Sequence, residues 1–313
     1  MTNTIVISEF MDEPAVDRLR QIAQVDYRPA LVDNQEALFE GLANANALIV
    51  RNRTQVNAQL LTHAPNLRVV GRLGVGLDNI DMDLCADKGI TVYPAVGANA
   101  QAVAEYVIAT TFLLLRGAYL ASAQVTAGQW PRPQLSNGLE VAGRRLGLVG
   151  FGGIGRLTAR LASALGMKIA AYDPMLSSDS PIWAETCAMQ MSLDELLQHS
   201  DVVSLHTPLT KETRHLINAD RIARMKAQAI LINTSRGGIV DEQALVAALQ
   251  AGKLRGAALD VFEDEPVKAE NSLPDMPNLI LTPHIAGLTQ EANERVSGVI
   301  AEKVMVFLVS RSR

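Results

Sequence analysis

The chain has 313 residues, with 28 basic and 33 acidic side chains, a formal net charge of −5 and 48% hydrophobic residues. This composition excludes a disordered, a collagen-like or a disulfide-scaffold protein, and the length predicts about two compact domains. Because no block of Lys and Arg is present, neither nucleic acid nor an anionic membrane is expected as the main partner.

The N-terminal stretch MTNTIVISEF lacks the basic region and the long apolar run of a secretion signal. The longest apolar stretch, residues 106–115, is much shorter than the ~20 residues that span a bilayer. Cys85 and Cys187 stand far apart and outside any CxxC or Cys/His pattern, so neither a disulfide framework nor a metal site is expected. We therefore expect a cytoplasmic protein without a membrane span or a bound metal.

In the first part of the chain, short β-branched runs alternate with segments of helical periodicity, which is typical of parallel strands joined by helical crossovers. The predicted strands are residues 4–8, 47–51, 67–71 and 91–93, and the predicted helices are 13–23, 35–43 and 81–88. An apolar pattern over 99–127 then predicts a long connecting helix, which is followed by Trp130-Pro131-Arg132-Pro133 and a polar loop.

A second strand series follows this loop, and its predicted strands are 146–149, 168–172, 202–206, 230–233, 257–261 and 279–281. Six strands with helical spacers make a complete doubly wound sheet. The tail 290–308 is predicted to be a helix that packs back on the first unit. The expected fold is α/β, with two Rossmann-like or flavodoxin-like doubly wound parallel-sheet domains and a cleft between them. A discontinuous substrate domain would comprise 1–99 plus 286–313, and a cofactor domain would comprise 100–285.

The sequence GFGGIG at 150–155 directly follows a predicted strand and opens a predicted helix. Glycines allow the tight turn and the close approach of a pyrophosphate, which the helix N-terminus attracts. Asp173 ends the next strand, about 20 positions on, where a carboxylate binds ribose hydroxyls and repels a 2′-phosphate. The pattern favours NAD over NADP, although the glycines could serve only a turn and Asp173 only a surface cap. The predicted cofactor residues here are Gly150, Gly152, Gly153, Ile154, Gly155 and Asp173.

Two further polar segments, His206-Thr207-Pro208 and Asn233-Thr234-Ser235, stand at carboxyl ends of predicted strands, where doubly wound sheets bind ligands. Thr207, Pro208, Thr234 and Ser235 are therefore candidate cofactor contacts. Ordinary loop capping is an equally good interpretation of either segment.

Three ionisable residues, Arg236, Glu265 and His284, also follow predicted strands, and strand ends of one parallel sheet converge on one edge. Hydride transfer from a carbon that carries a hydroxyl needs a base, for which His284 is the candidate. Glu265 would orient the imidazole, and the Arg236 guanidinium would bind a substrate carboxylate and polarise the adjacent carbonyl. Taken singly, His284 could be a capped core histidine and Glu265 a solvated loop acid.

Several separate motifs resemble the D-isomer-specific 2-hydroxyacid dehydrogenase family, nearest its phosphoglycerate dehydrogenase branch. They are NTSRGGIVDE at 233–242, ALDVF at 258–262 with Glu265-Pro266, Thr282-Pro283-His284, and GRLGVGLDNID at 71–81. The resemblance spans residues 49–287 in the family's order and implies an NAD-dependent oxidoreductase acting on CH–OH groups. It implies catalytic roles for Arg236, Glu265 and His284.

The resemblance further implies cofactor contacts from Gly153, Ile154, Asp260, Arg236, His284 and Gly287, with Asp260 near the nicotinamide carboxamide. It implies a homodimer formed by the cofactor domains, in which the long helix and the arm through Trp130 reach the other subunit. One departure is Gly153, which stands where the family usually has Arg. Backbone amides can bind phosphate without that side chain.

The loop that follows residue 71 resembles the family's substrate-binding segment. The backbone amides of Val75 and Gly76 would bind the substrate carboxylate. The resemblance places Arg51 and Arg72 toward the far end of the substrate, and Arg132 in the partner's site. A second departure, Leu73 where the phosphoglycerate branch usually has Ala, is expected to narrow the pocket; the implied substrate-binding residues are Arg51, Asn52, Arg72, Leu73, Val75, Gly76, Arg132, Arg236 and His284.

Clustered arginines beside a carboxylate site predict a second anionic group on the substrate. We therefore expect a three-carbon 2-hydroxy acid of the 3-phosphoglycerate or 3-sulfolactate type. The alternatives are a glyoxylate or hydroxypyruvate reductase, in which these arginines form surface salt bridges, and an NAD-sensing regulatory protein without turnover. Formate dehydrogenase shares the fold but has Gln where this chain has Glu265, which argues against that branch.

Overall fold

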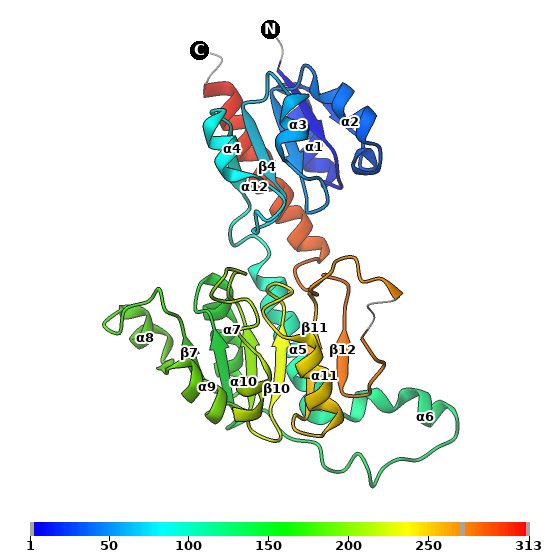
Figure 1. Cartoon of the computed structure of the whole chain (residues 1–313), viewed down its shortest axis with the longest axis vertical. Helices are drawn as coiled ribbons and strands as arrows, with labels where there is room; N and C mark the ends of the chain where they lie inside the picture. Colours follow the sequence, from blue (N-terminus) through cyan, green and yellow to red (C-terminus); the bar gives the residue numbers. More distant parts are fainter. Residues whose placement is uncertain (1–2, 270–272, 311–313) are drawn as a thin grey trace. The chain divides into compact units, whose positions relative to one another are not determined.

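The computed structural model describes residues 3–269 and 273–310. The chain divides into two compact units, one formed by Met1–Asn99 with Leu288–Arg313 and the other by Ala100–Gly287. Each unit contains one all-parallel sheet covered by helices on both faces (Figure 1). The predicted α/β fold class of two doubly wound parallel-sheet domains is confirmed.

The sheet of the first unit has the strand order β2-β1-β3-β4-β5, which is the flavodoxin-like doubly wound order. Its strands are β1 (Thr4–Ile7), β2 (Gln24–Tyr27), β3 (Ala47–Val50), β4 (Val69–Arg72) and β5 (Thr91–Pro94). Its helices are α1 (Glu13–Arg20), α2 (Gln35–Leu42), α3 (Ala58–Thr62), α4 (Met82–Asp87) and α12 (Gln290–Ser310), with a 3-10 turn η1 (Leu31–Asp33).

Alternate residues of each strand in this sheet enter different cores, because successive side chains point to opposite faces. Ile5 and Ile7 pack with α1 and α12, whereas Val6 packs with α2, α3 and α4. On the first face α12 lies so close to β4 that a Cβ on Gly71 would stand 2.6 Å from a methyl of Ile300. The predicted return of the tail helix to the first unit is therefore observed.

The sheet of the second unit has the order β12-β11-β10-β9-β6-β7-β8, a Rossmann order extended by one strand. Its strands are β6 (Arg145–Val149), β7 (Lys168–Tyr172), β8 (Met189–Gln190), β9 (Val202–Leu205), β10 (Ile230–Asn233), β11 (Gly256–Leu259) and β12 (Leu279–Leu281). Helices α5 (Ala100–Arg116) and α7 (Gly153–Ala164) share one core, and α9 (Leu193–His199), α10 (Ala219–Arg224) and α11 (Glu242–Gln250) share the other.

The long predicted helix over 99–127 is interrupted after Arg116. It continues as a 3-10 turn η2 (Ala118–Ala121) and a short helix α6 (Ser122–Thr126), and it leads into the arm that contains Trp130. A further short helix, α8 (Pro181–Thr186), precedes β8. No helix within residues 3–269 and 273–310 is long and apolar enough to cross a membrane.

Candidate active site

The glycine loop begins where β6 ends, and its backbone conformation requires glycine at two positions. Gly150 has φ +93°, and a Cβ there would stand 2.4 Å from the carbonyl oxygen of His206. A Cβ on Gly155 would stand 2.5 Å from the carbonyl oxygen of Gly150. The turn from β6 into α7 therefore depends on Gly150 and Gly155, as the pattern predicted.

In front of α7 the loop is open. A Cβ added to Gly152 or Gly153 would meet no atom within 4 Å. The 12-residue helix α7 begins at Gly153, so its first backbone N–H groups and positive dipole end lie at this open space, with Ile154 in the first turn. These features fit a pyrophosphate, and the absence of an arginine at position 153 leaves the amides accessible.

Asp173 follows β7 and is tied to the glycine loop. Its Oδ2 accepts a hydrogen bond from the Phe151 amide at 2.8 Å, and its Oδ1 accepts one from the Met175 amide at 2.9 Å. A carboxylate has about four acceptor positions, so capacity remains for ribose hydroxyls. The surface-cap interpretation is thus correct in part, because Asp173 caps its loop while standing beside the candidate pyrophosphate site.

The loops after β9 and β10 carry further polar groups to the same edge of the sheet. Thr207 and Pro208 follow His206, a half-buried residue whose Nε2 lies 3.0 Å from the Ser204 hydroxyl. Loss of hydration lowers the pKa of His206 to about 4, so its imidazole is neutral at physiological pH. The sequence analysis assigned no role to this histidine, because its lowered pKa results from burial in the folded structure, which the sequence does not show.

Asn233 organises the loop after β10. Its side-chain oxygen accepts hydrogen bonds from the amide and the hydroxyl of Ser235, and its side-chain nitrogen donates to the Arg236 carbonyl. The Thr234 hydroxyl is buried and has no hydrogen-bond partner within the described part of the chain. A buried polar atom without a partner is costly, so this hydroxyl fits a site that a polar ligand completes.

Gly237 brings the loops of Arg236 and Glu265 together. A Cβ on Gly237 would stand 1.7 Å from the carbonyl oxygen of Phe262, so these two backbones are in direct contact. Glu265 Oε1 accepts a hydrogen bond from the Phe262 amide at 3.0 Å, and its Oε2 lies 2.7 Å from Nδ1 of His284. The structure therefore joins Glu265 and His284 directly, and Arg236 occupies the adjacent loop.

The electrostatics of the pair suit a histidine that accepts a proton. Burial alone would raise the pKa of Glu265, but the His284 hydrogen bond, the Phe262 amide and the charges of His284 and Arg236 hold it below its ordinary value. Because an ionised carboxylate only accepts hydrogen bonds, Nδ1 of His284 carries the proton. Nε2 has no partner among the described residues, and the side chain is 40% exposed. Nε2 is therefore available to a substrate.

Asp260 fixes the backbone that presents His284. This carboxylate is 1% exposed, accepts hydrogen bonds from the Thr282 hydroxyl and the Ile285 amide through Oδ1, and accepts one from the Ala286 amide through Oδ2. His284 itself has φ +54°, a conformation that non-glycine residues rarely adopt. Asp260 thus holds the backbone of the strained loop that ends just before Gly287. The contacts of Asp260 and Gly287 with the cofactor stay predictions.

In the first unit, the loop after β4 presents free amides. Val75 is 39% exposed, and the backbone N–H groups of Val75 and Gly76 have no hydrogen-bond partner among the described residues. Consecutive unpaired amides can bind a carboxylate. This arrangement fits the role that the resemblance implied for them.

Arg51 follows β3 and is a half-buried cation held by neutral groups. Its Nη2 donates to Oδ1 of Asn293 at 2.6 Å, and its guanidinium carbon lies 5.6 Å from the centroid of the Phe10 ring. Burial lowers the pKa of Arg51. The nearby Glu9 carboxylate accepts hydrogen bonds from backbone amides, including that of Arg51, and forms no ion pair with the guanidinium within the described chain. Asn52, next to it, is exposed.

Arg72 and Leu73 are both buried where β4 ends. Leu73 is 3% exposed and belongs to the core that α12 covers, and its effect on a substrate pocket stays a prediction. Its side chain points to this helix layer because α12 closes that face of β4. Arg72 is 9% exposed and donates from Nη1 to the Leu73 carbonyl, so it supports the loop from within.

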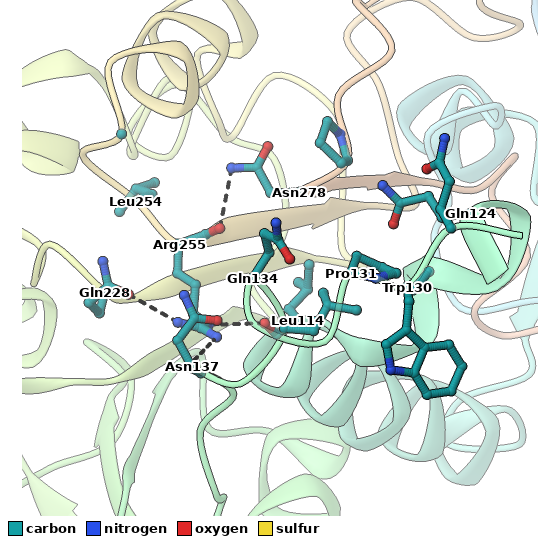
Figure 2. Close-up of a pocket in the computed structure, with 16 residues that line it drawn as sticks. Leu114, Gln124, Trp130, Pro131, Gln134, Asn137, Gln228, Leu254, Arg255 and Asn278 are labelled. Atoms are coloured by element: carbon teal, nitrogen blue, oxygen red, sulfur yellow. Dashed lines mark hydrogen bonds between the residues drawn. The ribbon is translucent and has the colours of Figure 1, made fainter.

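A cavity of about 800 Å³ lies at the opposite end of the second sheet, where the strands begin (Figure 2). Its walls come from the end of α5, the arm, and segments that precede β10, β11 and β12. Arg255 crosses it and donates to the carbonyls of Leu114 and Leu115. The catalytic candidates follow strands at their carboxyl ends, so this cavity is a separate feature. Arg132, on the arm, is exposed.

Comparison with known proteins agrees with this site. The model of the D-isomer specific 2-hydroxyacid dehydrogenase NAD binding domain matches residues 108–286. The chain is 51% identical over 300 residues to the (S)-sulfolactate dehydrogenase of Chromohalobacter salexigens, and the match covers 96% of each protein. It is 38% identical over 306 residues to a D-3-phosphoglycerate dehydrogenase of Methanocaldococcus jannaschii, covering 97% of this chain but 57% of that protein.

A solved structure gives the same result. D-Lactate dehydrogenase from Aquifex aeolicus, complexed with NAD and lactic acid, matches with a TM-score of 0.79 and 31% identity, over 98% of this chain and 96% of that one. The parallel sheet, the glycine loop and the Glu265–His284 pair define an NAD-dependent dehydrogenase that acts on a CH–OH group. The chain belongs to the D-isomer-specific 2-hydroxyacid dehydrogenase family. The predicted family, enzyme class and cofactor are confirmed.

Proposed function

We propose that this dehydrogenase interconverts a three-carbon 2-hydroxy acid and its 2-oxo acid, and that the substrate carries a second anionic group of the sulfonate or phosphate type. Arg51 carries this proposal, because its half-buried guanidinium is held by Asn293 and Phe10 and forms no ion pair in the described chain, although the Glu9 charge lies nearby. Such a guanidinium can bind an anion. The 51% identity to a sulfolactate dehydrogenase supports a sulfonate in particular.

The catalytic residues are assigned as follows. Nε2 of His284 takes the proton of the C2 hydroxyl, and Glu265 stabilises the imidazolium that forms. Arg236 binds the substrate carboxylate and polarises the C2 oxygen, and the amides of Val75 and Gly76 also bind the carboxylate. Bound at the second unit, NAD would supply the acceptor for the C2 hydride in oxidation, and NADH would supply the hydride donor in reduction.

The same proposal assigns NAD to the carboxyl edge of the second sheet. The glycine loop and the start of α7 would hold the pyrophosphate, and Asp173 would hold the ribose. The remainder of the NAD site would be lined by the loops that contain Thr207, Pro208, Thr234 and Ser235. The open space at Gly152 and Gly153 and the unpaired Thr234 hydroxyl support this assignment.

Asp173 sets the cofactor preference in this scheme. We expect Asp173→Asn to narrow the preference for NADH over NADPH by about 10- to 100-fold, because one or two charge-assisted hydrogen bonds of roughly 1.5–3 kcal/mol and a repulsive charge are lost. The amide retains an oxygen that can accept from Phe151 or Met175. Steady-state kcat/KM with both cofactors measures the change. Equal kcat/KM values for the two cofactors with the unchanged protein would contradict the role of Asp173.

The substrate proposal is tested by NADH oxidation with 2-oxo acids that carry a distal methyl, hydroxyl, carboxylate, phosphate or sulfonate group. We expect a strong preference for a distal anion, with sulfonate first. Arg51→Gln should reduce kcat/KM for that substrate by about 10- to 100-fold and leave glyoxylate unaffected, since a charge-assisted hydrogen bond is worth roughly 1.5–3 kcal/mol.

Arg53→Gln is the matched control for this variant. Arg53 lies two positions further along the same loop, is 58% exposed on its side chain and pairs with Asp33. We expect its substitution to change kcat/KM neither for the anionic substrate nor for glyoxylate. Equal rates with neutral and anionic acids, unaltered by Arg51→Gln, would instead make the protein a glyoxylate or hydroxypyruvate reductase. Turnover of none of the acids would favour the NAD-sensing role.

We also propose that two copies form a homodimer through the NAD-binding unit. Tyr119 of η2, Val125 of α6 and Trp130 of the arm are 62%, 49% and 75% exposed, and exposed apolar residues gathered in one segment are typical of an interface. The cavity beneath the arm offers a recess for a second copy (Figure 2). In such a dimer, Arg132 would contribute to the partner's substrate site.

Sedimentation equilibrium should give twice the 33.7 kDa mass of one chain. Trp130→Glu should shift the equilibrium to the monomer, because it places a charge in the apolar contact. Met189→Glu, at an exposed position of β8, serves as the control. A monomeric unchanged protein would contradict the dimer.

Finally, we propose that the enzyme acts in the cytoplasm. Cys85 and Cys187 are both free thiols in the structure, as expected of a reducing compartment. Fractionation of cells followed by an activity assay checks this proposal, and activity confined to a secreted fraction would contradict it.

A further inference from the structure

The turn that contains Glu265 is held in place by two hydrogen bonds of Glu263, two positions earlier in the chain. Glu263 donates its backbone N–H to Oε1 of Glu242 at 2.8 Å, and its own Oε1 lies 2.9 Å from Nε2 of His215. Neither contact involves the reacting groups. Both contacts fix the backbone of the segment whose Phe262 amide binds the Glu265 carboxylate.

The two residues that bind Glu263, Glu242 and His215, lie in or directly after the loops that follow the neighbouring strands β10 and β9. Glu242 is the first residue of α11, after the loop of Arg236, and His215 belongs to the loop after β9. His215 has φ +47°, and its amide donates to the Gly238 carbonyl at 2.7 Å. The three loops at this edge are therefore tied to one another: Glu263 contacts His215 and Glu242, and His215 also binds the Gly238 carbonyl directly.

The charges at this place make the arrangement costly. Burial and the neighbouring carboxylates of Glu263, Asp264 and Asp241 raise the pKa of Glu242, although the Glu263 amide acts in the opposite direction. A carboxylate among other carboxylates destabilises the fold unless its hydrogen bonds offset the repulsion. The hydrogen bond from the Glu263 amide offsets part of this repulsion at the Glu242 carboxylate.

We propose that His215 and Glu242 are positioning residues for Glu265, and through it for the orientation of His284. The inference rests on the proposed roles of Glu265 and His284. Without the two contacts the 262–265 turn is free to relax, and the Glu265 carboxylate no longer meets Nδ1 of His284 in a fixed geometry. Neither residue touches the substrate in this scheme, so substrate affinity should not depend on them.

The test is a double-mutant cycle measured by NADH oxidation with 3-sulfopyruvate, or with the best 2-oxo acid of the panel. His215→Ala and Glu242→Ala should each lower kcat by about 10- to 100-fold, because misplacement by about 1 Å has effects of this size. KM and NADH affinity should stay unchanged. Glu242→Gln keeps an oxygen for the Glu263 amide and should retain most activity.

In a Glu265→Gln background, neither alanine substitution should reduce kcat further, because residues that act through one group are not additive. His199→Ala, an exposed histidine on α9, is the control and should leave kcat unchanged in both backgrounds. The same fractional loss with and without Glu265 would overturn the proposal and indicate a general structural role. Should Glu242→Ala fail to fold, His215→Ala and Glu242→Gln still decide the question. An unchanged kcat in Glu265→Gln alone would instead refute the proposed function of Glu265.

Discussion

Replacement of His284 by alanine is expected to lower kcat by about 10²- to 10⁴-fold, the usual contribution of a general base. The unpartnered Nε2 is the atom assigned to take the C2 hydroxyl proton, and alanine has no group to replace it. The affinity for NADH should stay unchanged, because the glycine loop and Asp173 lie on other strands. Single-turnover rates and a fluorescence titration with NADH measure the two quantities separately.

His206→Ala is an instructive comparison for His284→Ala. His206 stands at the end of β9 in the same sheet, but its pKa of about 4 and its contact with Ser204 make it a neutral, hydrogen-bonded histidine. We expect this substitution to affect stability and cofactor affinity more than the chemical step. Loss of NADH binding in His284→Ala would mean that His284 has a structural role.

Substitution of Arg236 should have the second large effect. Arg236→Ala is expected to reduce kcat/KM by about 10²- to 10³-fold, since a bidentate, charge-assisted contact with the substrate carboxylate is lost. Arg236→Lys should recover only part of the activity, because an ammonium keeps the charge without the planar fork. The Ser235 carbonyl, which accepts from Nη1 at 2.6 Å, presets the guanidinium in the unchanged protein.

Inhibition by oxamate, a carboxylate analogue of a 2-oxo acid, checks this role independently of turnover. Its inhibition constant should rise with the loss of Arg236 and stay unchanged in His215→Ala. An Arg236→Ala variant with undiminished oxamate inhibition would exclude the carboxylate contact.

The sequence was sufficient for most of the fold because central strands are apolar on both faces. β3, β4, β9 and β10 are buried throughout, and their hydrophobic runs were predicted within a few residues. The edge strands β2 and β8 were missed: QVDY has only four residues and none of them is fully buried, and Met189–Gln190 is an exposed pair. Such strands form because a neighbouring strand offers hydrogen-bonding groups. This cause lies in the tertiary structure, so the hydrophobic periodicity of the sequence does not reveal it.

The catalytic candidates were predictable from topology, since Arg236, Glu265 and His284 each follow a strand of one parallel sheet. Side-chain direction was not predictable in the same way. Leu73 faces the core because α12, more than 200 positions later in the chain, covers that side of β4. His215 lies in no motif, and Glu242 only ends the NTSRGGIVDE motif. Their contacts with Glu263 could not be predicted, because these contacts arise only where three loops meet.

The position of α12 also has a consequence for biosynthesis. The ribosome makes residues 3–99 before the second unit, yet their sheet lacks the helix that covers β4 at Gly71 until α12 is made. The second unit, which is continuous in sequence, is complete before then. The usual order in which the N-terminal domain of a nascent chain matures first is therefore reversed here. Until α12 emerges, only α1 covers the apolar face that includes Ile5, Ile49 and Val69, and the part of this face at β4 is open to chaperone binding.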